Sequence, residues 1–348
     1  MIVSKRLFVL ILAIVFSWLI LLTGNSGNKN DNKQEIVNQY NVSGFSTDFT
    51  NIVDNNISSV VSINADKTIS SGFAYKQVDN YEYIICTYHG VADARSINVV
   101  FDSGYNANAS VVGYDAYCDI AVLQVEVPFT VKDVKIGDAS RSKAGEFVIC
   151  IGTPNSLDYA NSIEMGMVSS PLVCVDNEIV YKGNRISYYT NLLSLTANLA
   201  NGYSGSPIIN MNSEVIGMVT MKYSDDCCFI LPINEATIVA DQIINKEEFS
   251  KIQLGVKGTF ISKMKNYEKT NLNIPIDTIN GLYIEKVRPS SLCDLSGIKA
   301  KDIILSINNI AINDYSSELS ICYSKATTCE FKVLRNDEEL TLIGTIND

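Results

Sequence analysis

The chain contains a single histidine, His89, in the segment ICTYHGV. Apolar, mostly β-branched residues precede it and small or polar residues follow it, so the pattern predicts that His89 lies where a buried strand gives way to a loop. Such places suit catalysis, because a rigid strand aims a side chain that solvent still reaches. A lone imidazole is more often an ordinary hydrogen-bonded polar group. The other candidate residues must decide between these interpretations.

A histidine base requires a nucleophile, and the best candidate is Ser204 in the segment NGYSGSPIIN. The flanking Gly202 and Gly205 allow a tight turn in which main-chain N–H groups converge beside a serine hydroxyl. An ordinary Gly/Ser turn explains the same segment equally well. The nucleophile elbow of α/β-hydrolases is excluded, because Ser206 stands where its second glycine would be required.

The third member of such a site would be a carboxylate that orients the imidazole. Asp119 immediately precedes the apolar run IAVLQV, so it can be held at the mouth of a strand. Asp115, four residues earlier, competes for the same role. Each of them is also explained as a turn residue when it is judged alone.

The cysteine pattern gives no sign of a metal site or a disulfide framework. The count is nine, there is no CxxC, and the presence of only one histidine argues against a Cys/His zinc site. Cys227 and Cys228 are adjacent, which rarely allows a structural bridge. We therefore predict mostly buried free thiols, no metal and no cofactor.

Composition favours a folded chain that does not bind nucleic acid. Hydrophobic residues make up 47% and charged residues 19%, which is enough apolar material for a packed core. The net charge is −11 and lysine and arginine form no cluster, whereas nucleic-acid binding requires a basic face.

The N-terminus reads as a membrane anchor. Lys5 and Arg6 precede an apolar run from Leu7 to Leu22 that is interrupted only by Ser17. We predict a cytoplasmic segment (1–6), a transmembrane anchor (7–23) and a polar, Asn-rich tether (24–45) that places the rest of the chain outside the cytoplasm at the cell membrane. The alternative is a signal peptide that is cleaved after this segment, which would give a secreted protein.

Two folded units follow the tether. In the first, residues 46–248, a short amphipathic helix precedes many short strands separated by turn residues, and the segment NEATIVADQIINKEEF is helical by its period. This pattern favours a mainly β barrel or sandwich. The second unit, residues 252–348, contains further short strands such as DIILSIN and CEFKVL.

Taken together, ICTYHGV, DIAVLQV and NGYSGSPIIN resemble, in order, the His, Asp and Ser motifs of trypsin-like serine proteases, and most of all those of the HtrA/DegP-like branch. The intervening SSGFAY and KIGDASRSKAGEFVICIGTPNSL are also similar to that branch. The C-terminal unit resembles a PDZ domain, through QLGV and GLYIEKVRPSSLCDLSGIKAKDIILSINN. The resemblance implies a mainly β fold, with a trypsin-like double β-barrel protease domain followed by a PDZ domain.

The resemblance also implies residue roles. His89 would be the general base, Asp119 rather than Asp115 would orient it, and Ser204 would be the nucleophile. The main-chain N–H groups of Gly202 and Ser204 would form the oxyanion hole. In the PDZ domain, the carboxylate-binding loop would comprise Gln253, Leu254, Gly255 and Val256.

Several residues depart from the family pattern. Tyr203 and Ser206 differ from the usual residues beside the catalytic serine, and Cys86 replaces a usual threonine. Cys228 stands near the expected base of the substrate pocket, where it would favour a small aliphatic residue before the scissile bond.

The function implied is that of a membrane-tethered, extracytoplasmic serine endopeptidase. It would cleave unfolded or misfolded polypeptides and bind C-terminal peptides through its PDZ domain, and family members often assemble as trimers, so a homotrimer is one expectation. The alternative is a weakly active or inactive protease-fold chaperone or binding protein that acts through the PDZ domain.

Overall fold

The computed structural model describes residues 49–66, 68–181, 183–224, 227–247 and 251–346. The predicted cytoplasmic segment, anchor and tether (1–6, 7–23 and 24–45) lie outside these ranges. Within them, no helix has the length and apolar character needed to cross a membrane.

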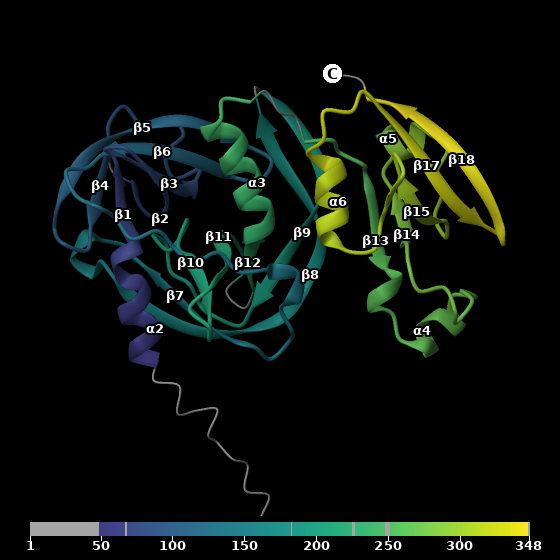
Figure 1. Ribbon diagram of the computed structural model, residues 1–348, viewed down its shortest axis with the longest axis horizontal. Coiled ribbons are helices and arrows are strands. Elements are labelled where there is room, and N and C mark those ends of the chain that lie inside the picture. Colours follow the sequence, from purple (N-terminus) through teal and green to yellow (C-terminus); the bar gives the residue numbers. More distant parts are fainter. Residues whose placement is uncertain (1–48, 67, 182, 225–226, 248–250, 347–348) are drawn as a thin grey trace, which may run out of the picture. The chain divides into compact units, whose positions relative to one another are not determined.

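The first six strands form a closed barrel in the order β1-β2-β3-β6-β5-β4 (Figure 1). Alternate residues of these strands fill its interior, among them Val61, Ile84 and Leu123. The strands are β1 (Val60–Ala65), β2 (Thr68–Val78), β3 (Tyr81–Thr87), β4 (Ile97–Phe101), β5 (Asn106–Asp115) and β6 (Ile120–Glu126).

A second closed barrel follows, in the order β10-β11-β12-β9-β8-β7. Its interior includes Val148, Leu193 and Ile230. The strands are β7 (Phe147–Gly152), β8 (Ser162–Tyr181), β9 (Asn184–Leu195), β10 (Pro207–Asn210), β11 (Val215–Ser224) and β12 (Cys227–Pro232). The two barrels confirm the prediction of a mainly β, double-barrel architecture.

Strand β6 is apolar on both faces, because each face is buried in a different cluster. Ala121 and Leu123 point into the first barrel, whereas Ile120 and Val122 belong to a cluster that also contains Ile149 of the second barrel. The alternation of side chains along a strand places these two sets on opposite faces. The run after Asp119 is therefore buried between the barrels as well as within one of them.

Two helices that the sequence pattern predicts are present in the double-barrel domain. Helix α2 (Phe49–Asn56) and the 3₁₀ turn η2 (Ile57–Ser59) lead into β1. Helix α3 (Ile233–Ile244) follows β12 and buries Ala236, Val239, Ala240 and Ile243, a spacing that lines one helical face. Short 3₁₀ turns are η3 (Ala139–Arg141) and η4 (Leu157–Tyr159).

The C-terminal domain is a sheet in the order β13-β14-β15-β17-β18, with β16 paired to β15. Its core includes Ile284, Ile304 and Phe331. The strands are β13 (Val256–Phe260), β14 (Leu282–Val287), β15 (Ile303–Ile307), β16 (Ile310–Ala311), β17 (Thr328–Arg335) and β18 (Glu338–Thr345). The helices are η5 (Ile261–Lys263), α4 (Asn266–Asn271), α5 (Leu292–Leu295) and α6 (Tyr315–Cys322).

The cysteines of the described residues form no disulfide. All whose side chains are described are buried except Cys174, which is partly exposed. Burial raises the pKa of the Cys86 thiol well above its ordinary value, and nearby Asp119 adds to the rise. The structure thus confirms the prediction of small, mostly buried thiols.

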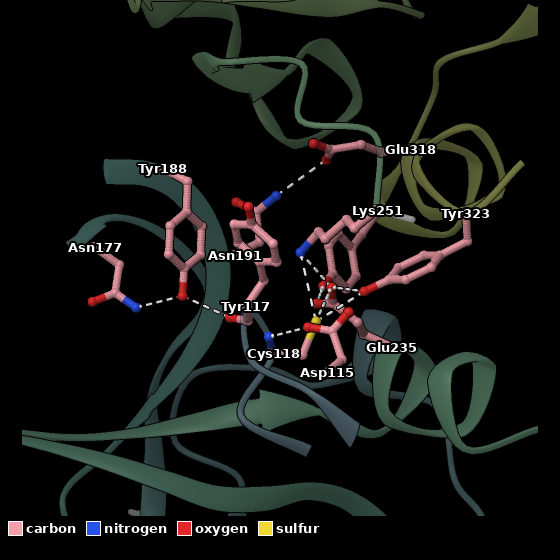
Figure 2. A network of polar contacts seen from close by, with 11 residues as sticks. Asp115, Tyr117, Cys118, Asn177, Tyr188, Asn191, Glu235, Lys251, Glu318 and Tyr323 are labelled. Atoms are coloured by element: carbon pink, nitrogen blue, oxygen red, sulfur yellow. Dashed lines mark hydrogen bonds and ion pairs between the residues drawn. The ribbon is translucent and has the colours of Figure 1, made fainter. Parts of the chain in front are cut away.

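A buried polar network contacts the turn between β5 and β6 (Figure 2). At its centre is Glu235 of helix α3, whose Oε1 accepts hydrogen bonds from Lys251 Nζ at 2.5 Å and from the Tyr323 hydroxyl at 2.7 Å. Its Oε2 accepts one from the Tyr315 hydroxyl at 2.6 Å. Cys118 Sγ lies 3.2 Å from Oε1. The network thus joins helix α3 to the C-terminal domain and to the turn that precedes Asp119.

Glu235 and Lys251 are both charged in this network. Burial alone would raise the pKa of Glu235, but the charge of Lys251 and the hydrogen bonds outweigh it, and the pKa of Glu235 falls below its ordinary value. Burial opposes the charge on Lys251, but surrounding groups, Glu235 among them, raise its pKa well above the ordinary value. Because the side chains of Glu235 and Lys251 are 0% and 8% exposed, neither charge has water as a substitute partner.

We predict that Lys251→Met lowers the free energy of unfolding by roughly 3–5 kcal/mol, because it leaves the Glu235 carboxylate charged and buried without its cation. Urea and thermal unfolding would measure the loss. Adding Glu235→Gln to Lys251→Met should recover part of it, because the uncompensated charge is removed.

The matched control for this prediction is Lys325→Met. Lys325 pairs with Glu247 at 3.1 Å, but its side chain is 71% exposed, so its loss should cost less than about 1 kcal/mol. Equal effects of the two lysine substitutions would show that the buried pair does not stabilise the fold in the way inferred here.

Candidate functional site

The fold gathers His89, Asp119 and Ser204 into one hydrogen-bonded row. His89 Nδ1 lies 2.6 Å from Asp119 Oδ2, and His89 Nε2 lies 3.2 Å from Ser204 Oγ. His89 follows β3 and Asp119 precedes β6, which pair side by side in the first barrel. Ser204 precedes β10 of the second barrel. The row therefore spans the junction of the two barrels.

Three donors surround the Asp119 carboxylate. Its Oδ1 accepts the main-chain N–H of His89 at 2.9 Å. Its Oδ2 accepts the Thr220 hydroxyl at 2.9 Å in addition to the imidazole. Asp119 adopts a left-handed backbone with φ of 57°, an uncommon conformation for a residue other than glycine. The carboxylate is thus fixed in position and remains an acceptor for the imidazole N–H.

The hydrogen bond to Asp119 raises the pKa of His89 above its ordinary value; partial burial opposes this, and the negative charge of Asp119 adds to it. Since the pKa is raised in the folded state, the pairing stabilises the fold fully below the unfolded-state pKa. This contribution is lost as pH rises through the folded-state pKa. His89 is therefore neutral, and able to act as a base, at pH values above its raised pKa.

Asp115, the competing carboxylate, serves a different purpose. It accepts the main-chain N–H of Cys118 at 2.8 Å and is only 8% exposed. Burial raises its pKa, and the Cys118 hydrogen bond and the charge of Lys251 oppose the rise. Asp115 therefore closes the turn that presents Asp119.

The loop around Ser204 turns sharply at two glycines. Gly202 has φ of 99° and Gly205 has φ of 87°. The main-chain N–H of Ser71 donates to the Ser204 carbonyl at 2.8 Å, and that of Gly205 donates to the Val219 carbonyl at 2.8 Å. Within the described residues, no backbone carbonyl accepts the N–H of Gly202 or that of Ser204. These two N–H groups are the ones that the family resemblance assigns to the oxyanion hole.

The residues that depart from the family pattern beside Ser204 are buried. Tyr203 is 4% exposed and packs in the core of the second barrel, and Ser206 is fully buried. A Cβ on Gly152 would lie 2.0 Å from Ser206 Oγ and 2.8 Å from the Tyr203 ring. Only glycine at 152 therefore leaves space for both side chains, and neither of them displaces His89 from Ser204.

Cys228 also belongs to this core. It is 3% exposed and clusters with Cys150, Leu195 and Val219. The cavity beside His89 is lined by other residues. Cys228 therefore does not line the cavity beside His89, and its place at the base of a substrate pocket stays a prediction.

A cavity of about 590 Å³ opens beside His89 and Asp119. Four tyrosines contribute to its wall: Tyr88, Tyr114, Tyr117 and Tyr188. Tyr88 and Tyr114 stack with ring centroids 4.2 Å apart. Sequence reasoning missed these residues, because Tyr88 and Tyr117 come from turns, Tyr114 from strand β5 and Tyr188 from strand β9, and the sequence does not reveal that these segments meet.

The predicted loop Gln253–Val256 enters the C-terminal domain. Leu254 and Val256 are 5% and 7% exposed and pack in the core. Gly255 has φ of 74°, and its carbonyl accepts the N–H of Arg288 at 2.8 Å. Gln253 and Gly255 line a cavity of about 960 Å³. Leu254 and Val256 do not line this cavity, but they line a smaller one of about 30 Å³ together with residues of helix α6.

No group of His, Cys, Asp and Glu in the described part of the chain could hold a metal ion. The site itself offers a serine hydroxyl, an imidazole and a carboxylate in one hydrogen-bonded row.

Comparison with known proteins agrees with this arrangement. Residues 70–218 match the trypsin-like peptidase domain. The serine protease Do-like HtrA of Bacillus subtilis (strain 168) is 30% identical over 280 residues, which cover 78% of this chain and 62% of the relative. The HtrA-like serine protease of Staphylococcus haemolyticus (strain JCSC1435) is 29% identical over 259 residues, covering 72% and 40%. The chain thus spans only part of the length of these relatives.

Solved structures share the fold. The HtrA-type protease AlgW with a tripeptide aligns with a TM-score of 0.59 and 19% identity, over 86% of this chain and 96% of that one. The serine endoprotease from Yersinia pestis aligns with a TM-score of 0.53 and 22% identity, over 86% and 97%.

We predict that the pKa of His89, followed by NMR, lies above about 6.5, the ordinary value for histidine. Asp119→Asn should lower it, because the negative hydrogen-bond acceptor is lost. The measurement is free of overlap, since the chain has one histidine. Asp115→Asn is the matched control and should leave the value close to that of the parent. Equal shifts in the two variants would contradict the assigned pairing.

Proposed function

Because the chain carries a trypsin-like peptidase domain and is related to the HtrA/Do serine proteases, we propose that it is a serine endopeptidase. The observation that carries the proposal is the row in which Asp119 holds His89 at 2.6 Å and His89 reaches Ser204 Oγ at 3.2 Å. This is the separation at which an imidazole takes a proton from a hydroxyl.

The reaction proposed is acyl transfer in two steps. Ser204 Oγ attacks the substrate carbonyl carbon while its proton passes to His89 Nε2, and Asp119 stabilises the imidazolium that forms. The N–H groups of Gly202 and Ser204 hold the oxyanion. The C–N bond then breaks, the amine leaves with the proton from His89, and an acyl ester remains on Ser204. Water, deprotonated by His89, hydrolyses the ester.

The proposed substrates are unfolded polypeptides. The cavity beside His89 is open and lined by tyrosines, which offer apolar surface with polar tips. An extended chain can place side chains there, whereas a compact folded protein presents few segments to it.

The proposed location is the outer face of a membrane, with residues 7–23 as the anchor. The support is the apolar run after Lys5 and Arg6. A secreted form, cleaved after this run, is the alternative. Salt and carbonate extraction of membranes would separate the two, since an inserted helix resists both treatments.

The C-terminal domain is proposed to be a PDZ domain that binds the free ends of polypeptides. The support is the loop Gln253–Val256, in which Gly255 turns the backbone at positive φ beside a cavity of about 960 Å³. Such loops direct backbone N–H groups toward a carboxylate.

The second candidate function, a protease-fold binding protein without activity, rests on Tyr203 and Ser206. Because both side chains are buried and the row to Ser204 is complete, the geometry favours the enzyme. A fluorophosphonate probe separates the two functions, since it labels only an activated serine.

We predict that Ser204→Ala abolishes cleavage of unfolded casein, with a loss of turnover of roughly 10⁶ as for other triad serines. Labelling by the fluorophosphonate should be lost together with it, and the unfolding temperature should stay close to that of the parent. Cleavage at the parental rate would refute the assignment of Ser204.

We also predict that peptides ending in a hydrophobic residue bind the Ser204→Ala chain at the C-terminal domain only with a free carboxylate. Titrations would compare matched free-acid and amidated peptides, and amidation should weaken binding at least about tenfold, since it removes a charge-assisted hydrogen-bond acceptor. Equal affinities would overturn the PDZ assignment and leave the protease proposal untouched.

A further inference from the structure

Ser71 of strand β2 makes two buried hydrogen bonds at the loop that carries Ser204. Its Oγ accepts the main-chain N–H of Thr153 at 2.9 Å and donates to the Gly202 carbonyl at 2.8 Å. The directions are fixed, because an N–H can only donate and a carbonyl can only accept. The single hydroxyl proton of Ser71 is thus committed to Gly202. Ser71 is 0% exposed, so no water competes.

The same hydroxyl is part of a chain that joins the two barrels. Ser62 Oγ of β1 lies 2.5 Å from Thr153 Oγ1, just after β7, and both are buried. The main-chain N–H of Ser71 also donates to the Ser204 carbonyl at 2.8 Å. Ser71 therefore holds the loop on both sides of Tyr203.

Contacts to the carbonyls of three successive peptides fix the directions of the two N–H groups that no backbone carbonyl accepts. Peptide groups are planar and trans, so holding a carbonyl oxygen on one side aims the N–H of the same peptide to the other. The N–H of Asn155 holds the Asn201 carbonyl at 2.8 Å, which aims the Gly202 N–H away from that segment. The N–H of Ser206 holds the Tyr203 carbonyl at 2.8 Å, which aims the Ser204 N–H in the same way. The Ser71 hydroxyl holds the Gly202–Tyr203 peptide that lies between these two peptides, and without it Gly202, a residue with wide backbone freedom, could turn and separate the two N–H groups.

We propose that Ser71 is a positioning residue for peptide hydrolysis: its hydroxyl locks the Gly202–Tyr203 peptide so that the N–H groups of Gly202 and Ser204 converge on one oxyanion. The inference rests on the proposed protease function and adds to it a residue outside the catalytic row. Ser71→Ala would leave the Gly202 carbonyl and the Thr153 N–H buried without this partner, which favours a relaxed loop.

The matched control is the neighbouring Ser70. Its side chain is also buried, at 1% exposed, but its Oγ has no hydrogen-bond partner among the described residues. Ser70→Ala removes the same atom from the same strand without touching the loop. Ser71→Cys is the second variant, because a thiol fills the space but is a weak donor.

The experiment measures kcat and KM on a fluorogenic peptide and the inhibition constant of a peptide aldehyde, whose adduct with Ser204 places an oxyanion in the hole. Removing one oxyanion donor outright costs about 10²–10³ in kcat. For Ser71→Ala, which misplaces the donors, we expect kcat to fall roughly 10–100-fold. KM should change less than about twofold, and the aldehyde should bind more weakly by a factor similar to the fall in kcat. Ser71→Cys should lie between Ser71→Ala and the parent, and Ser70→Ala should match the parent.

The outcomes separate this inference from the proposed function. A parent chain that neither cleaves the peptide nor binds the aldehyde would contradict both. A parent that cleaves, with Ser71→Ala equal to Ser70→Ala, would overturn the inference alone. A fall in kcat without weaker aldehyde binding would also overturn it, since the hydroxyl would then act on the fold rather than on the oxyanion hole. If Ser71→Ala does not fold, Ser71→Cys decides by the same comparison.

Discussion

The site depends on how closely the backbone around Ser204 approaches its neighbours. A Cβ on Gly202 would lie 2.2 Å from the Thr153 carbonyl oxygen, and one on Gly205 would lie 2.0 Å from that of Ser71. These neighbours are backbone atoms, which cannot rotate away, and both glycines have positive φ. The loop can therefore press against strand β2 and the end of β7 only with glycine at both places.

This close contact of the Ser204 loop requires the two barrels to keep one relative position. Apolar packing contributes most of the free energy that holds them there. Burial of a residue such as Phe73 or Ile120 contributes about 1.5–3 kcal/mol, whereas a buried hydrogen bond contributes about 1 kcal/mol net. Both side chains are fully buried in the cluster shared by the barrels. Packing therefore holds the barrels together, and the directional hydrogen bonds of Ser71 decide how the loop is oriented within the contact.

Apolar packing and directional hydrogen bonds differ in how well the sequence predicts them. Strands and the helix over 233–244 were predictable, because apolar period is a local property. The candidates His89, Asp119 and Ser204 were found through their flanking residues. The role of Ser71 was not found from the sequence, because its partners at 153 and 202 are distant in the chain and serine is common in strands. Likewise, the burial of Glu235 and Lys251 against each other follows from the fold, because the two residues come from separate elements of the chain.

The buried pair of Glu235 and Lys251 also restricts the position of the turn that precedes Asp119. Cys118 contacts both Glu235 and Tyr323, and Asp119 is the next residue along the chain. A buried charge tolerates few arrangements, because each unpaired oxygen or proton is costly without water. The turn before β6 is therefore fitted to one arrangement of Lys251, Tyr315 and Tyr323 around helix α3. The carboxylate that orients His89 is thus held by the packing of the first barrel on one side and by groups of the C-terminal part of the chain on the other.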